Sequence, residues 1–239
     1  MSASENPRGL KRLGQRLRKK ARKIVHGGPD DFLKSCRGVI HVGANTGQER
    51  DLYAAHDLDV VWIEPIPDVF ATLAANTDAY PRQAALRALI TERAGDTHTL
   101  HVANNEGASS SILELDQHRD IWPEVDYVAD IELVSESLPS ALAAAGIDTG
   151  RHDALIIDTQ GTELMVLEGA APMLAQFTHV RTEAADFPAY KGAPRRPASR
   201  PTWPATGSAS PARTSSRGAT PAAPISTCCS RARPDPGRV

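Results

Sequence analysis

Residues 39–48 read VIHVGANTGQ, and residues 60–65 read VVWIEP. Each stretch begins with a run of apolar, mostly β-branched residues, which is typical of a strand buried on both faces. A loop with two glycines follows the first run, and a carboxylate comes at the end of the second. A strand, a glycine loop, a helix and a second strand that ends in an acid form the layout of a nucleotide-binding βαβ unit. The two stretches therefore predict a parallel sheet with a ligand site at the carboxyl ends of its strands.

The spacing of the glycines favours one kind of nucleotide ligand. Gly43 and Gly47 have no glycine between them, whereas a dinucleotide fingerprint carries a middle glycine where the pyrophosphate lies. The loop lets the backbone approach a ligand, and the helix after it begins with free N–H groups. Glu64 is placed to accept both hydroxyls of a ribose. The loop therefore favours S-adenosylmethionine over NAD; a purely structural glycine turn and an NAD-linked or nucleotide-sugar enzyme are the alternatives.

A second acidic loop is predicted at the same edge of the sheet. Residues 154–157 read ALII, which predicts another buried strand, and Asp158 follows it directly. Because the carboxyl ends of parallel strands share an edge, Asp158 is expected to face the same pocket as the Gly43 loop. Asp158 is the first candidate for a group that accepts a proton from a substrate. Further candidates are Glu163, Glu183 and His41, the last because histidine titrates near neutrality. A hydrogen-bonded histidine beneath the loop is the favoured alternative for His41. Capping of the following helix is the alternative role of Asp158.

Strand-like and helical patterns alternate along the middle of the chain. Strands are expected near residues 38–42, 59–64, 85–90, 97–103, 127–134, 153–158 and 178–183. Helices are expected near residues 47–56, 67–76, 137–145 and 160–175. The runs at 97–103 and 127–134 alternate apolar and polar residues, which is typical of antiparallel pairing. The sequence thus predicts an α/β fold with a doubly wound, mostly parallel sheet and an antiparallel insertion.

The composition suits one α/β domain between two basic ends. The chain has 239 residues, of which 41% are hydrophobic, enough for one substantial core. Residues 27–192 carry ten Lys and Arg against 27 Asp and Glu, so the middle of the chain is acidic. We therefore divide the chain into a basic N-terminal helix or extension (1–28), the α/β domain (29–192) and a Pro/Arg-rich disordered tail (193–239).

Charge, cysteine and hydropathy patterns exclude several classes of protein. An acidic body repels phosphates, so no nucleic-acid partner is expected. Cys36 stands alone and Cys228 and Cys229 are adjacent, which offers neither a disulfide framework nor zinc spacing. We therefore expect a cytoplasmic setting and no metal ligands. No apolar run reaches the ~18 residues of a transmembrane segment. Residues 8–25 place leucines at near-helical spacing among basic residues. This pattern favours a solvated extension, and weak peripheral contact with an anionic membrane is the alternative.

The motifs of the chain, taken together, resemble those of the FkbM family of S-adenosylmethionine-dependent methyltransferases. The likeness extends over residues 36–192. The matching stretches are HVGAN at 41–45, GQE at 47–49, IEP at 63–65, GASSSIL at 107–113, DTQGTE at 158–163, VLEGA at 166–170 and TE at 182–183. Their shared order and spacing are far more specific than any single motif. The resemblance implies a Rossmann-like, class I methyltransferase fold.

The same resemblance implies an activity and its ligands. The family most often methylates a hydroxyl of a sugar or a polyketide-like product, so the implied cofactor is S-adenosylmethionine and the partner a small-molecule or glycan substrate. The residues implied to contact the cofactor are His41, Gly43, Ala44, Asn45, Gly47, Glu64 and Asp158. The serines at 109–111 are expected to form a polar wall over the pocket.

Two departures from the family pattern concern the site. His41 stands where the first loop usually opens with Asp. Ile156 and Gln160 replace the Lys and the Glu of the family's later motif. The catalytic base therefore stays open among the carboxylates Asp158, Glu163 and Glu183.

The sequence after residue 192 also departs from the family. Residues 193–239 contain nine Pro and eight Arg but no Lys, Glu, Leu, Phe or Tyr, so no apolar face is expected there. The helix and the antiparallel strand pair with which such sheets normally end are missing. Frameshifted translation of a GC-rich gene explains this composition, and a genuine Pro/Arg-rich interaction tail is the alternative. The alternative function is accordingly a truncated or frameshifted, non-catalytic remnant of such an enzyme.

Overall fold

The computed structural model describes residues 28, 30–184, 189–193 and 226–231. The chain divides into two units, residues 1–35 and 36–239. In the first unit, η1 (Asp31–Ser35) is a short 3-10 helix in which the Asp31 carboxylate accepts from the Gly28 backbone and pairs with Lys34. The basic segment predicted at residues 8–25 lies outside the described residues.

Within the described residues, the second unit is built on a six-stranded sheet whose neighbouring strands all run parallel. In sheet order the strands are β3 (Gln83–Leu86), β2 (Asp59–Ile63), β1 (Gly38–Val42), β7 (Ala154–Ile157), β8 (His179–Ala184) and β9 (Ser226–Arg231). The strand order reverses at β1, which has β2 on one side and β7 on the other. Open α/β sheets bind ligands beyond the carboxyl ends of the strands at such a switch point.

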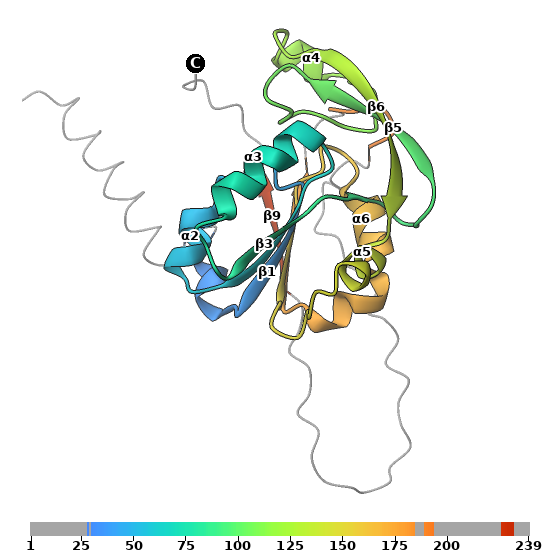
Figure 1. The fold of residues 1–239 in the computed structure, drawn as a ribbon. Coiled ribbons are helices and arrows are strands. Elements are labelled where there is room, and N and C mark those ends of the chain that lie inside the picture. Colours follow the sequence, from blue (N-terminus) through green and yellow to red (C-terminus); the bar gives the residue numbers. More distant parts are fainter. Residues whose placement is uncertain (1–27, 29, 185–188, 194–225, 232–239) are drawn as a thin grey trace, which may run out of the picture. The chain divides into compact units, whose positions relative to one another are not determined.

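Helices cover both faces of this sheet (Figure 1). One face carries α2 (Arg50–Ala55) and α3 (Pro67–Thr77), and the other carries α5 (Leu138–Ala144) and α6 (Glu163–Gly169). On the α5 and α6 face, Ile40 and Leu155 of the strands pack with Leu142 of α5, and all three are fully buried. The doubly wound α/β fold predicted from the sequence is therefore confirmed.

A separate three-stranded sheet in the described part of the chain has the order β4-β6-β5. Its strands are β4 (Leu89–Ile90), β5 (Thr97–Ala103) and β6 (Tyr127–Glu136). β5 and β6 run antiparallel, with an irregularity after Val102, and the segment between them contains α4 (His118–Ile121). This pair confirms the predicted antiparallel insertion.

The structure divides two elements that the sequence predicts as continuous. The strand expected at 85–90 becomes β3 and β4, which lie in different sheets. The helix expected at 160–175 becomes α6 and the 3-10 helix η2 (Ala171–Gln176). Pro172 has no N–H for a continuing helix. Gly169, the last residue of α6, lies so close to the loop after β4 that a Cβ there would be 2.0 Å from the Thr91 carbonyl oxygen.

β9 differs from what the sequence predicts for the tail. No regular structure is expected in residues 193–239, whereas residues 226–231 form a strand beside β8, with His179 opposite Ser226. This stretch lacks the prolines and glycines that interrupt the rest of the tail, so it is compatible with strand pairing. β9 runs parallel to β8, unlike the antiparallel pair expected of the family. Residues 194–225 and 232–239 lie outside the described residues.

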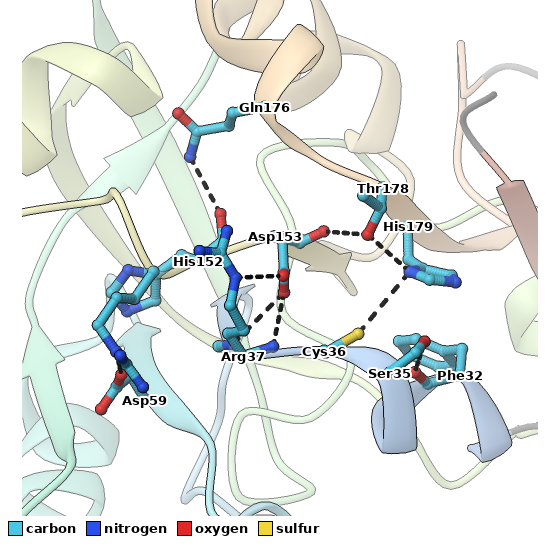
Figure 2. A network of polar contacts seen from close by, with 12 residues as sticks. Phe32, Ser35, Cys36, Arg37, Asp59, His152, Asp153, Gln176, Thr178 and His179 are labelled. Atoms are coloured by element: carbon cyan, nitrogen blue, oxygen red, sulfur yellow. Dashed lines mark hydrogen bonds and ion pairs between the residues drawn. The ribbon is translucent and has the colours of Figure 1, made fainter. Parts of the chain in front are cut away.

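A polar network joins the amino ends of β1, β7 and β8 (Figure 2). The Asp153 carboxylate accepts from the backbone N–H and from the guanidinium Nε of Arg37, each at 2.9 Å. Thr178 Oγ1 donates to the Asp153 carbonyl oxygen at 3.1 Å, and His179 Nδ1 lies 2.9 Å from that hydroxyl and 3.7 Å from Cys36 Sγ. Burial opposes ionisation of Asp153, but the Arg37 donors outweigh it and lower the pKa of Asp153. This network fixes the strand ends opposite to the candidate site.

Candidate functional site

A cavity of about 320 Å³ lies at the carboxyl ends of β1, β2 and β7. The loops after these strands form part of its wall, and residues of β4, β5 and the 107–112 loop complete it. The predicted site residues that line it are His41, Gly43, Ala44, Asn45, Glu64 and Asp158. Its volume falls at the lower end of the range for small-molecule sites. The cavity thus occupies the switch point of the sheet, where the sequence predicts a ligand.

Gly43 brings two of these loops into contact. Its φ is +78°, and a Cβ at this position would lie 1.8 Å from the Asp158 carbonyl oxygen. The backbone N–H groups of Gly43 and Ala44 both donate to the Ile63 carbonyl oxygen at 3.0 Å. Only glycine fits both this backbone conformation and this contact. The residue predicted to let a ligand approach therefore also lets the Asp158 loop approach β1.

The Glu64 carboxylate lies buried beneath the glycine loop. Its side chain accepts from the backbone N–H of Asn45 at 2.9 Å and from that of Ile66 at 3.0 Å, one on each oxygen. Burial raises the pKa of Glu64 to about 7, against the effect of these two donors. Each carboxylate oxygen has a second lone pair. Glu64 can therefore accept two ligand hydroxyls while it holds the loop.

His41 belongs to an aromatic cluster on the α2 side of the sheet. Its Nδ1 lies 3.2 Å from the Tyr53 hydroxyl, and its ring centroid lies 5.2 Å from that of Trp62. Burial, together with the charge of Arg181, lowers the pKa of His41 to about 3. His41 therefore does not titrate near neutrality here, and its contact with Tyr53 agrees with the favoured alternative of a hydrogen-bonded histidine. His41 borders the cavity as a neutral group.

Asp158 lies where the sequence places it, directly after β7 and on the cavity wall. Its backbone N–H donates to the Val42 carbonyl oxygen at 2.9 Å, which holds the loop against the end of β1. Its Oδ1 accepts from Gln160 Nε2 at 2.6 Å. The helix α6 begins at Glu163 with Thr162 as its N-cap, so Asp158 does not cap that helix.

Two predicted site residues are not part of the cavity lining, namely Gly47 and Glu163. Gly47 forms a turn with φ +71°, and its N–H donates to the Ala44 carbonyl oxygen at 2.9 Å. Glu163 Oε1 accepts from the backbone N–H groups at 159 and 161, at 3.1 and 3.0 Å. Glu183 lies on β8 opposite Ser230 of β9. Of Asp158 and Glu163, Asp158 is thus the candidate catalytic carboxylate that lines the cavity.

Tyr190 joins two walls of the cavity. Its hydroxyl donates to Gln160 Oε1 at 2.8 Å and lies 3.3 Å from the Ser109 carbonyl oxygen. Ser111 Oγ donates to the Gln160 carbonyl oxygen at 2.8 Å. The serine wall expected over the pocket is therefore fixed to the Asp158 loop. The role of Tyr190 carries no signal in the sequence, because no motif surrounds it and it lies 30 residues from Gln160.

An apolar surface completes the cavity. Leu89 and Ile90 of β4 and Leu100 of β5 contribute to it. The sequence places β5 in an insertion and gives no sign that Leu100 faces a ligand site. The cavity therefore combines carboxylates and backbone donors with a set of aliphatic side chains.

Two other kinds of site are not found among the described residues. No described helix has the length and apolar character that a membrane crossing requires. Among the described residues, no three His, Cys, Asp or Glu side chains are grouped so that they could hold a metal ion.

Comparison with known proteins identifies the family of the chain. The model of the methyltransferase FkbM domain matches residues 41–207. This match covers more than half of the chain and includes each loop that lines the cavity. No curated protein matches the chain significantly. With its Rossmann-like α/β fold, the chain belongs to the FkbM methyltransferase family.

Proposed function

We propose that this chain is an S-adenosylmethionine-dependent O-methyltransferase that acts on a hydroxyl of a sugar, glycan or secondary metabolite. Family membership supports methyl transfer. The cofactor is supported by one observation above all, the buried Glu64 carboxylate beneath the Gly43 loop. A carboxylate in this place, at the end of the second strand, is the group that accepts ribose hydroxyls in nucleotide sites.

The residues of the cavity fit the proposed cofactor. Glu64 would hold the ribose, since its two oxygens keep lone pairs for the two hydroxyls. The Gly43 loop would approach the methionine part. The aliphatic residues Leu89, Ile90 and Leu100 offer an apolar surface for the adenine ring. The anionic Asp158 side chain suits the positive charge of the cofactor.

When bound, the cofactor supplies a methyl group on a positively charged sulfur. The part of the protein is to align the substrate hydroxyl with that methyl group and to accept its proton. We assign the proton to Asp158, because this candidate carboxylate lines the cavity. Asp158 would accept the hydroxyl proton when the substrate oxygen takes up the methyl group. Glu163 contributes by holding the backbone of the Asp158 loop.

The chemistry of the cavity agrees with a small-molecule or glycan substrate rather than a nucleic acid. Among the described residues that line it there is no Lys or Arg to bind phosphates. The cysteine pattern supports a cytoplasmic reaction. We take residues 29–192 as the methyltransferase domain.

A second candidate is a non-catalytic remnant of such an enzyme. The composition of residues 193–239 favours it, as does the parallel pairing of β9 where an antiparallel pair is expected. An incomplete sheet edge would weaken a fold that is stable by only ~5–15 kcal/mol.

Calorimetric titration with S-adenosylmethionine and S-adenosylhomocysteine separates the two candidates. We expect the folded chain to bind both, and Glu64→Gln to bind at least about 10-fold more weakly because it accepts fewer hydroxyls. Asp78→Asn is the matched control, since Asp78 is exposed at the end of α3 and outside the cavity lining. A folded wild-type chain that binds neither compound contradicts the proposal and favours the remnant.

A further inference from the structure

In the loop after β7, the side-chain amide of Gln160 holds the carboxylate of Asp158. Gln160 Nε2 donates to Asp158 Oδ1 at 2.6 Å, and Gln160 Oε1 accepts from the Tyr190 hydroxyl at 2.8 Å. An ionised carboxylate only accepts hydrogen bonds, and a tyrosine hydroxyl is able to donate. One orientation of the amide therefore satisfies both neighbours, with its NH₂ toward Asp158 and its oxygen toward Tyr190.

Tyr190 fixes this amide from a buried position. Its side chain packs on Gly161, where a Cβ would lie 3.0 Å from the tyrosine ring. The backbone of Gln160 is held as well, because Ser111 Oγ donates to its carbonyl oxygen at 2.8 Å. Gln160 has φ +57°, a conformation that a residue other than glycine keeps only where its surroundings hold it. Side-chain and backbone contacts thus converge on one residue at the cavity wall.

We propose that Gln160, anchored by Tyr190, is the positioning residue that presents the Asp158 carboxylate to the cavity as an anion. This inference rests on the proposed function, since it assigns Asp158 to a methyl-transfer site. An anion here attracts a cationic methyl donor and accepts a hydroxyl proton. An amide suits this task because it donates a hydrogen bond without competing for that proton. The usual family motif has a Glu at position 160 together with a Lys at position 156, but Ile156 replaces that Lys here. A carboxylate at position 160 of this chain would therefore compete with Asp158, since two acids this close do not both ionise readily.

Among the described residues, the ionisable groups next to this loop include Glu163, Tyr190, Tyr127 and His118. Glu163 faces the backbone N–H groups at 159 and 161. Burial raises the pKa of Tyr190 and of Tyr127, so both are neutral at pH 8. Burial lowers the pKa of His118, whose ring lies 5.6 Å from that of Tyr190, so it is neutral as well.

A charge-swap cycle at positions 158 and 160 tests the inference, with Asp158→Asn, Gln160→Glu and the double variant. In urea unfolding of the cofactor-free protein at pH 8, Gln160→Glu should unfold at lower urea because it opposes two carboxylates. The double variant restores an amide–carboxylate pair with the charge at 160, so it should regain most of that loss. Asp158→Asn keeps an acceptor for the Gln160 amide and should unfold near the wild-type midpoint.

Titration of the same proteins with S-adenosylmethionine separates positioning from stability. We expect Asp158→Asn to bind at least about 10-fold more weakly than wild type. The double variant should bind equally weakly although its stability is restored. Wild-type affinity in the double variant would overturn the inference, because the place of the carboxylate would then not matter. A Gln160→Glu protein as stable as wild type would also overturn it.

Tyr190→Phe tests the anchor, since it removes the hydroxyl and keeps the ring against Gly161. We expect the affinity for S-adenosylmethionine to fall about 3- to 10-fold. Tyr80→Phe is the control, because the Tyr80 hydroxyl contacts Asp51 and Tyr80 is not part of the cavity lining. Unchanged affinity in Tyr190→Phe would remove Tyr190 from the inference. If the wild-type chain itself does not bind, the proposed function fails, and the urea cycle alone decides whether Gln160 holds Asp158.

Discussion

At the scale of single residues, the burial of the Glu64 carboxylate destabilises the ligand-free protein, although the same buried position suits the carboxylate to bind a ligand. Its folded-state pKa is about 7, against an ordinary value of 4.5. Between these values the folded state binds more protons than the unfolded state, so the free energy of unfolding falls as pH rises. The stabilisation is complete below pH 4.5, and the whole loss above pH 7 is roughly 3 kcal/mol. We expect urea unfolding between pH 5 and 8 to show this fall, and S-adenosylmethionine affinity to rise as the carboxylate ionises.

Glu64→Gln is the reference for this pH dependence. The amide loses one backbone hydrogen bond at every pH, because its NH₂ meets the N–H of either Asn45 or Ile66. The free energy of unfolding of Glu64→Gln should therefore lie below that of wild type at low pH but change little with pH, so that the difference shrinks or reverses above pH 7. Equal slopes in the two proteins would mean that Glu64 ionises normally despite its burial.

Gly43 combines a left-handed conformation with a close contact. Gly43→Ala should lower the free energy of unfolding by about 3 kcal/mol or more, because the new Cβ collides with the Asp158 carbonyl oxygen. Gly146→Ala separates the two effects, since Gly146 has φ +66° but nothing within 4 Å of a Cβ. That variant should lose only the backbone part, about 1–2 kcal/mol. Similar losses in both variants, measured by urea unfolding, would show that the Gly43 contact yields easily.

At the scale of elements, Asp153 links the chain before β1 to the start of β7. Asp153→Asn should lower the free energy of unfolding at pH 7 by about 2 kcal/mol, because charge-assisted hydrogen bonds from Arg37 are weakened. The pKa of Asp153 is lowered from 3.8, so this stabilisation is present above that pH. It is lost as pH falls through the folded-state value. Wild type and Asp153→Asn should therefore converge in urea unfolding below pH 3.8.

The exposed Asp68 in the first turn of α3 provides the control for the comparison of wild type with Asp153→Asn. Asp68→Asn should stay within about 0.5 kcal/mol of wild type. A constant difference between wild type and Asp153→Asn down to low pH would assign the effect to packing rather than to charge.

At the scale of the whole molecule, β9 decides whether part of the Pro/Arg-rich tail belongs to the fold. Successive N–H groups of a strand alternate in direction, so either Thr227 or Cys228 donates toward β8. Proline has no N–H, so one of Thr227→Pro and Cys228→Pro should lower the free energy of unfolding by about 3 kcal/mol. Both should bind S-adenosylmethionine like wild type, because the described cavity lining ends at residue 162. If neither variant changes urea unfolding, β9 does not stabilise the sheet.

The helices and strands of this molecule were predictable from the sequence where the pattern that marks them lies within the element itself. The structure confirms the strands predicted at β1, β2 and β7. They were predictable because a strand buried on both faces needs a continuous apolar run. The split of residues 85–90 into β3 and β4 was not predictable, since the partner of each half lies elsewhere in the chain. The same holds for β9, which pairs with a strand more than 40 residues away.

The site shows the same division. Glycine spacing and the acids after the strands placed Gly43, Glu64 and Asp158 at the cavity, because the ends of parallel strands share one edge. The sequence left Asp158, Glu163 and Glu183 as candidate bases, of which Asp158 and Glu163 can be compared in the structure. The structure separates them, with one carboxylate on the cavity wall and the other against loop backbone.

By itself, the sequence determined the FkbM family, the α/β fold and the loops that form the cavity, because periodicity and motif spacing are properties of neighbouring residues. Only the tertiary structure decided that His41 is neutral and that Gln160 lies between Asp158 and Tyr190. Burial and hydrogen bonding between distant segments set the charge and orientation of a side chain, and neither can be read from its neighbours in the chain.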